Sequence, residues 1–248
     1  MTPSSVPSGR SGPGGPRATA RLAGALLLFS VVCGVLAQSA RGRLVVEGDA
    51  AATAGRFLAG ASIVWQGMAA YLGEAACLLA AAVLLYRLFR PAGPTLAAMS
   101  VVFAVAGVAV KTAAFVLFIA PLAILGGAAT PALTAAQREA LAMLALDLNS
   151  SGAMVGLVFL GGFAMLKGVL ILRSTFVPRV LGVLGIVGGA GWLAFVVQPF
   201  GLRYYGIIVT LAVVATAAQV AWFLSVGVRE AEWYRQAAGV GGAVPVGG

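Results

Sequence analysis

Two charged residues lie deep inside apolar stretches that are long enough to cross a membrane. Glu74 is near the middle of one stretch and Lys111 is near the middle of the next. At such depth an ionisable side chain can serve in a proton or ion relay, anchor a polar ligand, or form a structural ion pair. Glu74 and Lys111 are therefore the candidate intramembrane polar site, and the sequence leaves these three roles open.

Depth and helical facing predict that these two side chains meet. Glu74 lies about 13 residues from the outer end of its stretch and Lys111 about 14 from its own, so at about 1.5 Å per residue their depths agree within a few ångström. A short loop joins the two stretches, which favours antiparallel neighbours. Lys111 also falls on a stripe of small residues, typical of closely packed membrane helices, which comprises Ala97, Ser100, Ala104, Gly107 and Ala114. We expect Glu74 and Lys111 to form an ion pair.

Other polar residues in or beside the apolar stretches rank lower as site candidates. Gln66 and Gln219 are expected to hydrogen-bond between helices. Asn149, with the two serines that follow it, is expected to cap the start of a helix, and a separate short amphipathic helix is expected before it, over residues 134–148. Lys167 is expected to extend its ammonium to the nearby membrane interface. Asp49 is expected in a solvated loop.

The residues that many enzymes need are missing. The chain contains no histidine, which excludes histidine-ligated haem, His-rich metal clusters and any catalytic histidine base. Cys33 and Cys77 lie at different points of apolar stretches, so neither a disulfide nor a metal site is expected. Gly182 and Gly185 do not form a phosphate loop, because no Lys-Ser or Lys-Thr follows them. We therefore predict no catalytic residues, no cofactor and no metal, and we expect the protein not to be an enzyme.

Six long apolar stretches must position these residues. A membrane-spanning helix needs about 20 apolar residues, and helices satisfy every backbone hydrogen bond internally. The stretches do not alternate as β-barrel strands would. We therefore predict an all-α fold, a polytopic transmembrane helical bundle with about six spans, at residues 22–38, 61–86, 96–125, 150–172, 180–197 and 204–228.

Composition supports an integral membrane protein. Of 248 residues, 61% are hydrophobic and only 9% are charged, whereas soluble domains have about 25% charged residues. Tails rich in Pro, Gly and Ser predict disorder at residues 1–17 and 237–248, which flank a transmembrane domain over 18–236. The first stretch could instead be a cleaved signal peptide, with residues 35–37 as the cleavage site.

Positive charge predicts the orientation. The net charge is +9, but the arginines lie singly or in pairs at the ends of apolar stretches, which favours membrane topology over nucleic-acid binding. More of them flank the side that holds both termini. We therefore expect a multi-pass protein of the bacterial cytoplasmic membrane with both termini in the cytoplasm.

Several motifs occur in an order that resembles a family of bacterial membrane proteins, domain of unknown function 4386. They are RLAG at 21–24, GDAAATA at 48–54, LLYRLFRP at 84–91, LDLNS at 146–150, GLVF at 156–159 and RSTFVPRVLGVLG at 173–185. The resemblance implies a six-helix membrane protein and no assigned activity. It also implies that this chain departs from the family pattern, which usually has histidine at Asn149 and often an acidic residue at Gln219.

These observations leave more than one function open. The first expectation is a non-enzymatic structural, lipid-binding or partner-binding module, whose partners are membrane lipids and a possible second copy packed through glycine-rich helix faces. The alternative is a small-solute or proton-coupled transporter that uses Glu74 and Lys111. A solvent-accessible cavity with converging polar groups would count against the first expectation.

Overall fold

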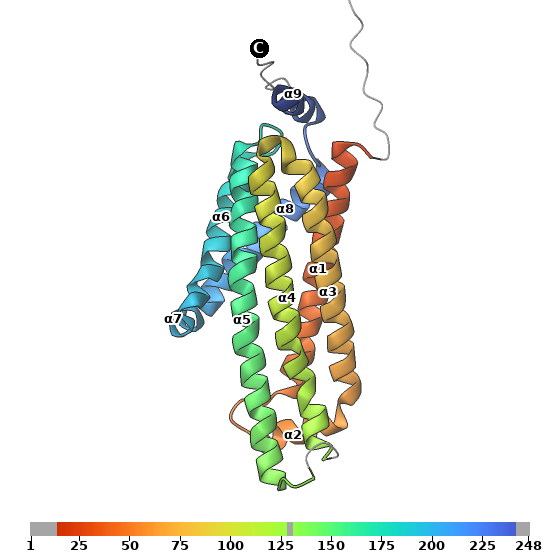
Figure 1. The fold of residues 1–248 in the computed structure, drawn as a ribbon, viewed down its shortest axis with the longest axis vertical. Coiled ribbons are helices and arrows are strands. Elements are labelled where there is room, and N and C mark those ends of the chain that lie inside the picture. Colours follow the sequence, from red (N-terminus) through yellow and green to blue (C-terminus); the bar gives the residue numbers. More distant parts are fainter. Residues whose placement is uncertain (1–13, 128–130, 242–248) are drawn as a thin grey trace, which may run out of the picture.

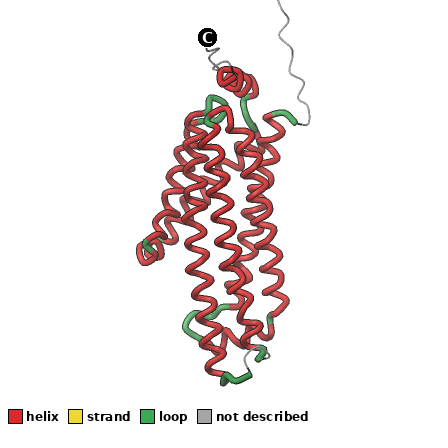
Figure 2. Tube along the Cα trace, viewed as in Figure 1, coloured by secondary structure: helices red, strands yellow, loops and turns green. Residues whose placement is uncertain are grey.

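The computed structural model describes residues 14–127 and 131–241, and the described part of the chain consists of helices and short connections without strands (Figure 2). The helices, in chain order, are α1 (Pro16–Leu44), α2 (Ala50–Ala59), α3 (Ala61–Phe89), η1 (Arg90–Ala92), α4 (Pro94–Leu125), α5 (Ala135–Arg173), α6 (Arg179–Leu193), η2 (Ala194–Val196), α7 (Gln198–Arg203), α8 (Tyr205–Ser225) and α9 (Glu230–Gly241).

Six of these helices are long and apolar enough to cross a membrane, namely α1, α3 with η1, α4, α5, α6 with η2, and α8. Their outer surfaces carry many exposed Leu and Val side chains, as a surface that contacts lipid would. The predicted all-α fold with six long apolar helices is confirmed.

The bundle has two ends of different character (Figure 1). At one end, the α9 end, lie the start of α1, the α3–α4 turn and the α5–α6 turn; α2, the end of α4 and the start of α5 lie at the other, the α2 end. Helices α3, α4 and α5 run almost the whole length, whereas α6 and α8 occupy only the part nearer the α9 end and meet at α7. The 15 residues of α6 contrast with the 39 of α5.

One expected helix boundary is wrong. Thr134 and Gln137 form the predicted capping box, but the helix that they start does not stop at residue 148. It continues without a break through Asn149 to Arg173. Asn149 therefore lies inside α5, where its side chain has other partners, and it caps no helix.

The connections and termini also contain more helix than the sequence patterns predict. Asp49 caps α2 by accepting a hydrogen bond from the Ala52 amide at 2.8 Å, so part of the expected loop is helical. Helix α1 starts at Pro16, and α9 extends to Gly241, past the predicted start of the C-terminal tail. Residues 1–13 and 242–248 of the predicted tails lie outside the described residues.

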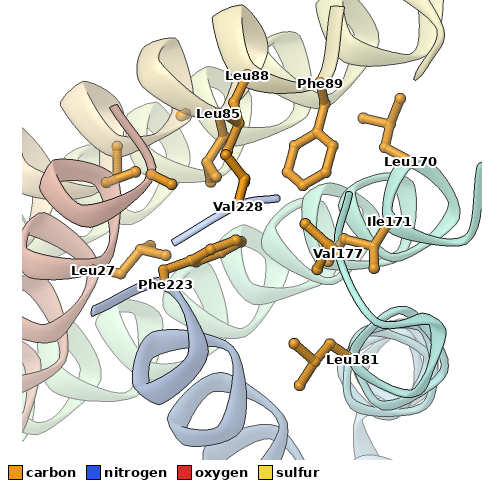
Figure 3. Close-up of a cluster of buried hydrophobic side chains, with 14 of the residues drawn as sticks. Leu27, Leu85, Leu88, Phe89, Leu170, Ile171, Val177, Leu181, Phe223 and Val228 are labelled. Atoms are coloured by element: carbon orange, nitrogen blue, oxygen red, sulfur yellow. The ribbon is translucent and has the colours of Figure 1, made fainter. Parts of the chain in front are cut away.

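Two hydrophobic clusters hold the bundle together. The larger one is near the α9 end, where Leu27, Phe89, Ile171 and Phe223 bring together α1, α3, α5 and α8 (Figure 3). The smaller one is at the α2 end and consists of Leu44, Phe57, Val64, Phe118 and Leu146. Helices α1, α3, α4 and α5 contribute to both clusters, whereas α6 and α8 contribute only to the larger one.

Glycines allow the long helices to approach closely. An added Cβ at Gly156 would lie 2.9 Å from the Gly107 carbonyl oxygen, and one at Gly189 would lie 2.6 Å from the Gly161 carbonyl oxygen. The glycine-rich faces of α5 and α6 are thus packed against helices of the same chain, as membrane helices with small residues commonly are.

Candidate functional site

Glu74 and Lys111 form an ion pair inside the bundle. The Lys111 Nζ atom donates a hydrogen bond to Glu74 Oε1 at 2.7 Å. The side chains of Lys111 and Glu74 are 16% and 17% exposed, so both are largely but not completely covered. The pairing expected from depth and facing is confirmed.

Three helices surround the carboxylate and the ammonium. The Lys111 Nζ atom lies 5.2 Å from the centre of the Tyr71 ring, close enough for a cation–π contact. From α1, Gly34 faces the carboxylate, since an added Cβ would lie 3.3 Å from Glu74 Cδ. The Ser30 hydroxyl donates to the Glu74 backbone carbonyl at 3.2 Å, which ties α1 to α3 at the same level.

The small-residue stripe that holds Lys111 packs on α5 rather than on α3. The predicted stripe is buried at Ala97, Ser100, Ala104, Gly107 and Ala114. An added Cβ at Gly156 on α5 would lie 2.6 Å from Lys111 Cγ, so the lysine stem lies directly over this glycine. Lys111 thus contacts α5 with its stem and reaches α3 with its ammonium, and the pair couples three helices.

A second polar cluster involves an arginine that the sequence did not single out as a site residue. Arg41 on α1 donates from Nη1 to Asn149 Oδ1 at 3.1 Å and from Nη2 to Ser150 Oγ at 2.8 Å. The Asn149 side-chain amide donates to the Ala114 carbonyl oxygen at 2.9 Å. Asn149 therefore joins α1, α4 and α5. The three consecutive polar residues at 149–151 were the sequence feature that could have indicated this cluster.

Lys167 does not extend to the interface, contrary to the expectation. The residue is only 6% exposed, and its Nζ atom lies 5.2 Å from the centre of the Phe163 ring, one turn back toward the start of α5. Helical side chains lean toward the N-terminus of their helix, which here is away from the nearby end. Because α6 and α8 also cover this face, the ammonium stays inside the bundle.

Lys167 lines a cavity of about 30 Å³ between α5, α6 and α8. Its polar lining comprises Lys167, Trp192, Thr216 and Gln219. The rest consists of small residues, namely Ala164, Gly185, Gly188, Gly189, Ala212 and Ala215. The volume is sufficient for one or two water molecules.

The two glutamines have different surroundings. Gln219 is 1% exposed and donates from Nε2 to the Leu181 carbonyl oxygen at 2.9 Å, which confirms the expected bond between helices. Gln66 is exposed on α3, and in the described part of the chain its side chain makes no hydrogen bond to another helix. Gln66 is therefore not brought into the polar clusters.

The two cysteines are not bonded to each other. Cys33 and Cys77 are both free, as expected from their positions. Cys33 Sγ packs near Gly73, with 3.2 Å to an added Cβ there, so it fills space between α1 and α3.

The comparisons identify a family but no closer relative. No curated protein and no solved structure matches the chain. The family described as "Domain of unknown function (DUF4386)" matches residues 22–227, which include all six long apolar helices or most of each. On this match, the chain belongs to the DUF4386 family.

Proposed function

We propose that this protein is a non-enzymatic multi-pass membrane module that binds a lipid or a partner rather than converting a substrate. The observation that carries the proposal is the direct contact between Glu74 and Lys111. Each group neutralises the other, and Tyr71 and Gly34 pack beside them. A pair closed in this way holds helices in register and offers no free acid, base or nucleophile.

The cavity at Lys167 counts against a bundle without any polar site, and within this proposal it favours a binding role over a purely structural one. Polar groups from three helices converge on it, which is the feature that a simple packing role does not require. Among the described residues that line the cavity, none carries a carboxylate or a thiol. The lining therefore suits recognition better than covalent or acid–base chemistry.

A carrier for protons or small solutes is the second candidate. The observation that favours it is the remaining exposure of the ion pair, 16% and 17% for the two side chains. Partial exposure could let a proton or a solute compete with Lys111 for the carboxylate of Glu74. Six helices alone leave little room for a path across the membrane, and a homo-oligomer could provide one between its subunits. The carrier candidate therefore includes a homo-oligomer.

Reconstitution into liposomes separates the two candidates. We expect the wild-type protein to retain phospholipid after purification, detected by native mass spectrometry, and to leave the proton permeability of the liposomes at the protein-free level. Glu74→Gln should then behave like the wild type. Protein-dependent proton flux that falls in Glu74→Gln would reject the structural role of the pair and favour the carrier.

We also propose that both termini face the cytoplasm of a bacterial cell. At the α9 end lie Arg17, Arg21, Arg87, Arg90, Arg173, Arg179, Arg229 and Arg235; further toward the α2 end are Arg41, Arg43, Arg56, Arg138 and Arg203. The richer end faces the cytoplasm by the positive-inside rule. Single cysteines placed in the α3–α4 turn and in α2 of a Cys33→Ala/Cys77→Ala background test this, since only those in α2 should react with an impermeant thiol reagent in intact cells.

A further inference from the structure

We infer that the cavity between α5, α6 and α8 is a binding site for a small monovalent anion of chloride size, with the Lys167 ammonium as its charged partner. This inference goes beyond the proposed function, because such an anion could bind in a structural bundle or in a carrier. It rests on residues that are separate from the Glu74–Lys111 pair.

Lys167 has no counter-ion among the described residues. Only 6% of its surface is exposed, so the residue is 94% buried. Within residues 14–127 and 131–241 it makes no hydrogen bond or ion pair. Helices α6 and α8 contain no acidic residue. The nearest acidic residue on α5 is Asp147, which is 20 residues or about 30 Å along the helix from Lys167.

Residues with hydrogen-bonding side chains on two further helices line the same cavity. Thr216 on α8 and Trp192 on α6 are among the lining residues, and neither side chain hydrogen-bonds to another described residue. Gln219 uses Nε2 to bind the Leu181 carbonyl, and its amide also borders the cavity. An ammonium, a hydroxyl and an indole N–H are donors that suit an anion.

The cavity is small because glycines bring its walls close together. Glycines at 185, 188 and 189 form the α6 wall, and added Cβ atoms there would lie 2.6 Å from Gln219 Nε2, 3.2 Å from the Ala212 Cα and 2.6 Å from the Gly161 carbonyl oxygen. The helices are thus as close as glycine allows, and the remaining space of about 30 Å³ corresponds to one or two water molecules, which a single halide ion can replace. The small, mostly apolar lining residues favour a weakly hydrated single charge.

A thermal unfolding experiment tests the site. The purified full-length protein in detergent is exchanged into sodium gluconate and titrated with sodium chloride or bromide at constant ionic strength. We expect a rise in the unfolding midpoint that grows with the logarithm of the halide concentration above Kd and amounts to about 4 °C at tenfold excess over Kd. A midpoint that does not differ between gluconate and chloride overturns the proposal.

Matched variants assign the effect to the cavity. Lys167→Met should abolish the dependence on chloride, whereas Arg173→Met, an exposed cation near the same end of α5, should keep it. Thr216→Val, which removes one donor with little change of shape, should weaken chloride binding several-fold. Chloride dependence that survives in Lys167→Met would overturn the proposal.

A direct measurement keeps the inference testable if Lys167→Met fails to fold. Line broadening of the ³⁵Cl resonance by wild-type protein should be displaced by bromide and reduced in Thr216→Val. Broadening that is equal in the wild type and Thr216→Val, or that gluconate displaces as well as bromide does, would show adsorption outside the cavity and would also overturn the proposal.

Discussion

Two lysines lie inside the helical bundle, and their surroundings differ in an instructive way. Each has its Nζ atom 5.2 Å from the centre of an aromatic ring, Tyr71 for Lys111 and Phe163 for Lys167. Lys111 also has the carboxylate of Glu74 at 2.7 Å, whereas Lys167 has a small cavity instead. The more deeply buried lysine is therefore the one without a carboxylate.

The comparison shows that an aromatic ring does not replace a counter-charge. A cation–π contact contributes about 0.5–2 kcal/mol, and an unpaired charge within a membrane costs at least about 2.5–3.5 kcal/mol. At Lys111 the carboxylate supplies the difference. At Lys167 a bound anion would supply it, and without one the fold bears the cost.

The largest change in stability is expected when Lys111 loses its carboxylate partner and so comes to resemble Lys167. Glu74→Leu leaves the Lys111 ammonium without its carboxylate and should destabilise the protein by about 3 kcal/mol. The double variant Glu74→Leu/Lys111→Met should recover most of this loss, because a packed apolar pair replaces the ion pair. Thermal unfolding in detergent measures both, and a Glu74→Leu variant as stable as the wild type would mean that the pair contributes little.

The next effect tests whether close packing positions the paired lysine. Gly156→Ala would place a Cβ 2.6 Å from Lys111 Cγ and 2.9 Å from the Gly107 carbonyl oxygen, so α4 and α5 would have to separate. We expect a loss of about 2 kcal/mol, typical of overpacking. Gly206→Ala is the control, since nothing lies within 4 Å of its added Cβ. Equal stability of the two variants would contradict the close contact.

A smaller effect of opposite sign is expected at the unpaired lysine. In gluconate buffer, Lys167→Met should raise stability by about 1 kcal/mol, because a buried amine without a partner is replaced by an apolar side chain of similar length. Urea or thermal unfolding of the two proteins checks this. Destabilisation by more than the measurement error would indicate that Lys167 has a protein partner after all.

The smallest effect concerns the fit of α1 against the pair. Gly34→Ala adds a methyl group 3.3 Å from Glu74 Cδ, which the carboxylate can accommodate by moving a few tenths of an ångström. We expect a cost of about 0.5 kcal/mol, at the lower end for an overpacked contact. A much larger loss in the same unfolding assay would show that α1 holds Glu74 rigidly.

The parts of this fold that could be predicted depend on neighbours in sequence. Six apolar stretches were sufficient to predict six helices, and a short turn between α3 and α4 was sufficient to place Glu74 opposite Lys111. Both inferences use only helix geometry and a fixed connection. The capping box at Thr134 was also readable, because its two partners are three residues apart.

The parts that could not be predicted depend on distant helices. Asn149 looks like a helix cap, but Arg41 and the Ala114 carbonyl satisfy its side chain in the middle of α5. Lys167 looks able to reach the interface, but α6 and α8 cover it. The residues next to Asn149 in the sequence do not reveal its hydrogen-bonding partners. Those next to Lys167 do not reveal the helices that cover it.

The unequal lengths of the helices divide the molecule between two solvents. Helix α5 has 39 residues and is about 58 Å long, nearly twice the roughly 30 Å thickness of the hydrocarbon layer. Part of α5 therefore extends beyond this layer, and its charged residues Arg138, Glu139 and Asp147 lie toward the α2 end. In water, the cluster around Phe57 and Phe118 at that end would be stabilised by the release of hydration water. Among acyl chains the hydrophobic effect does not drive helices together, so close packing and hydrogen bonds between helices must stabilise the bundle there. Helix α5 thus connects the cluster at the α2 end, which would pack like the core of a small soluble protein, with the apolar helices that need a bilayer around them.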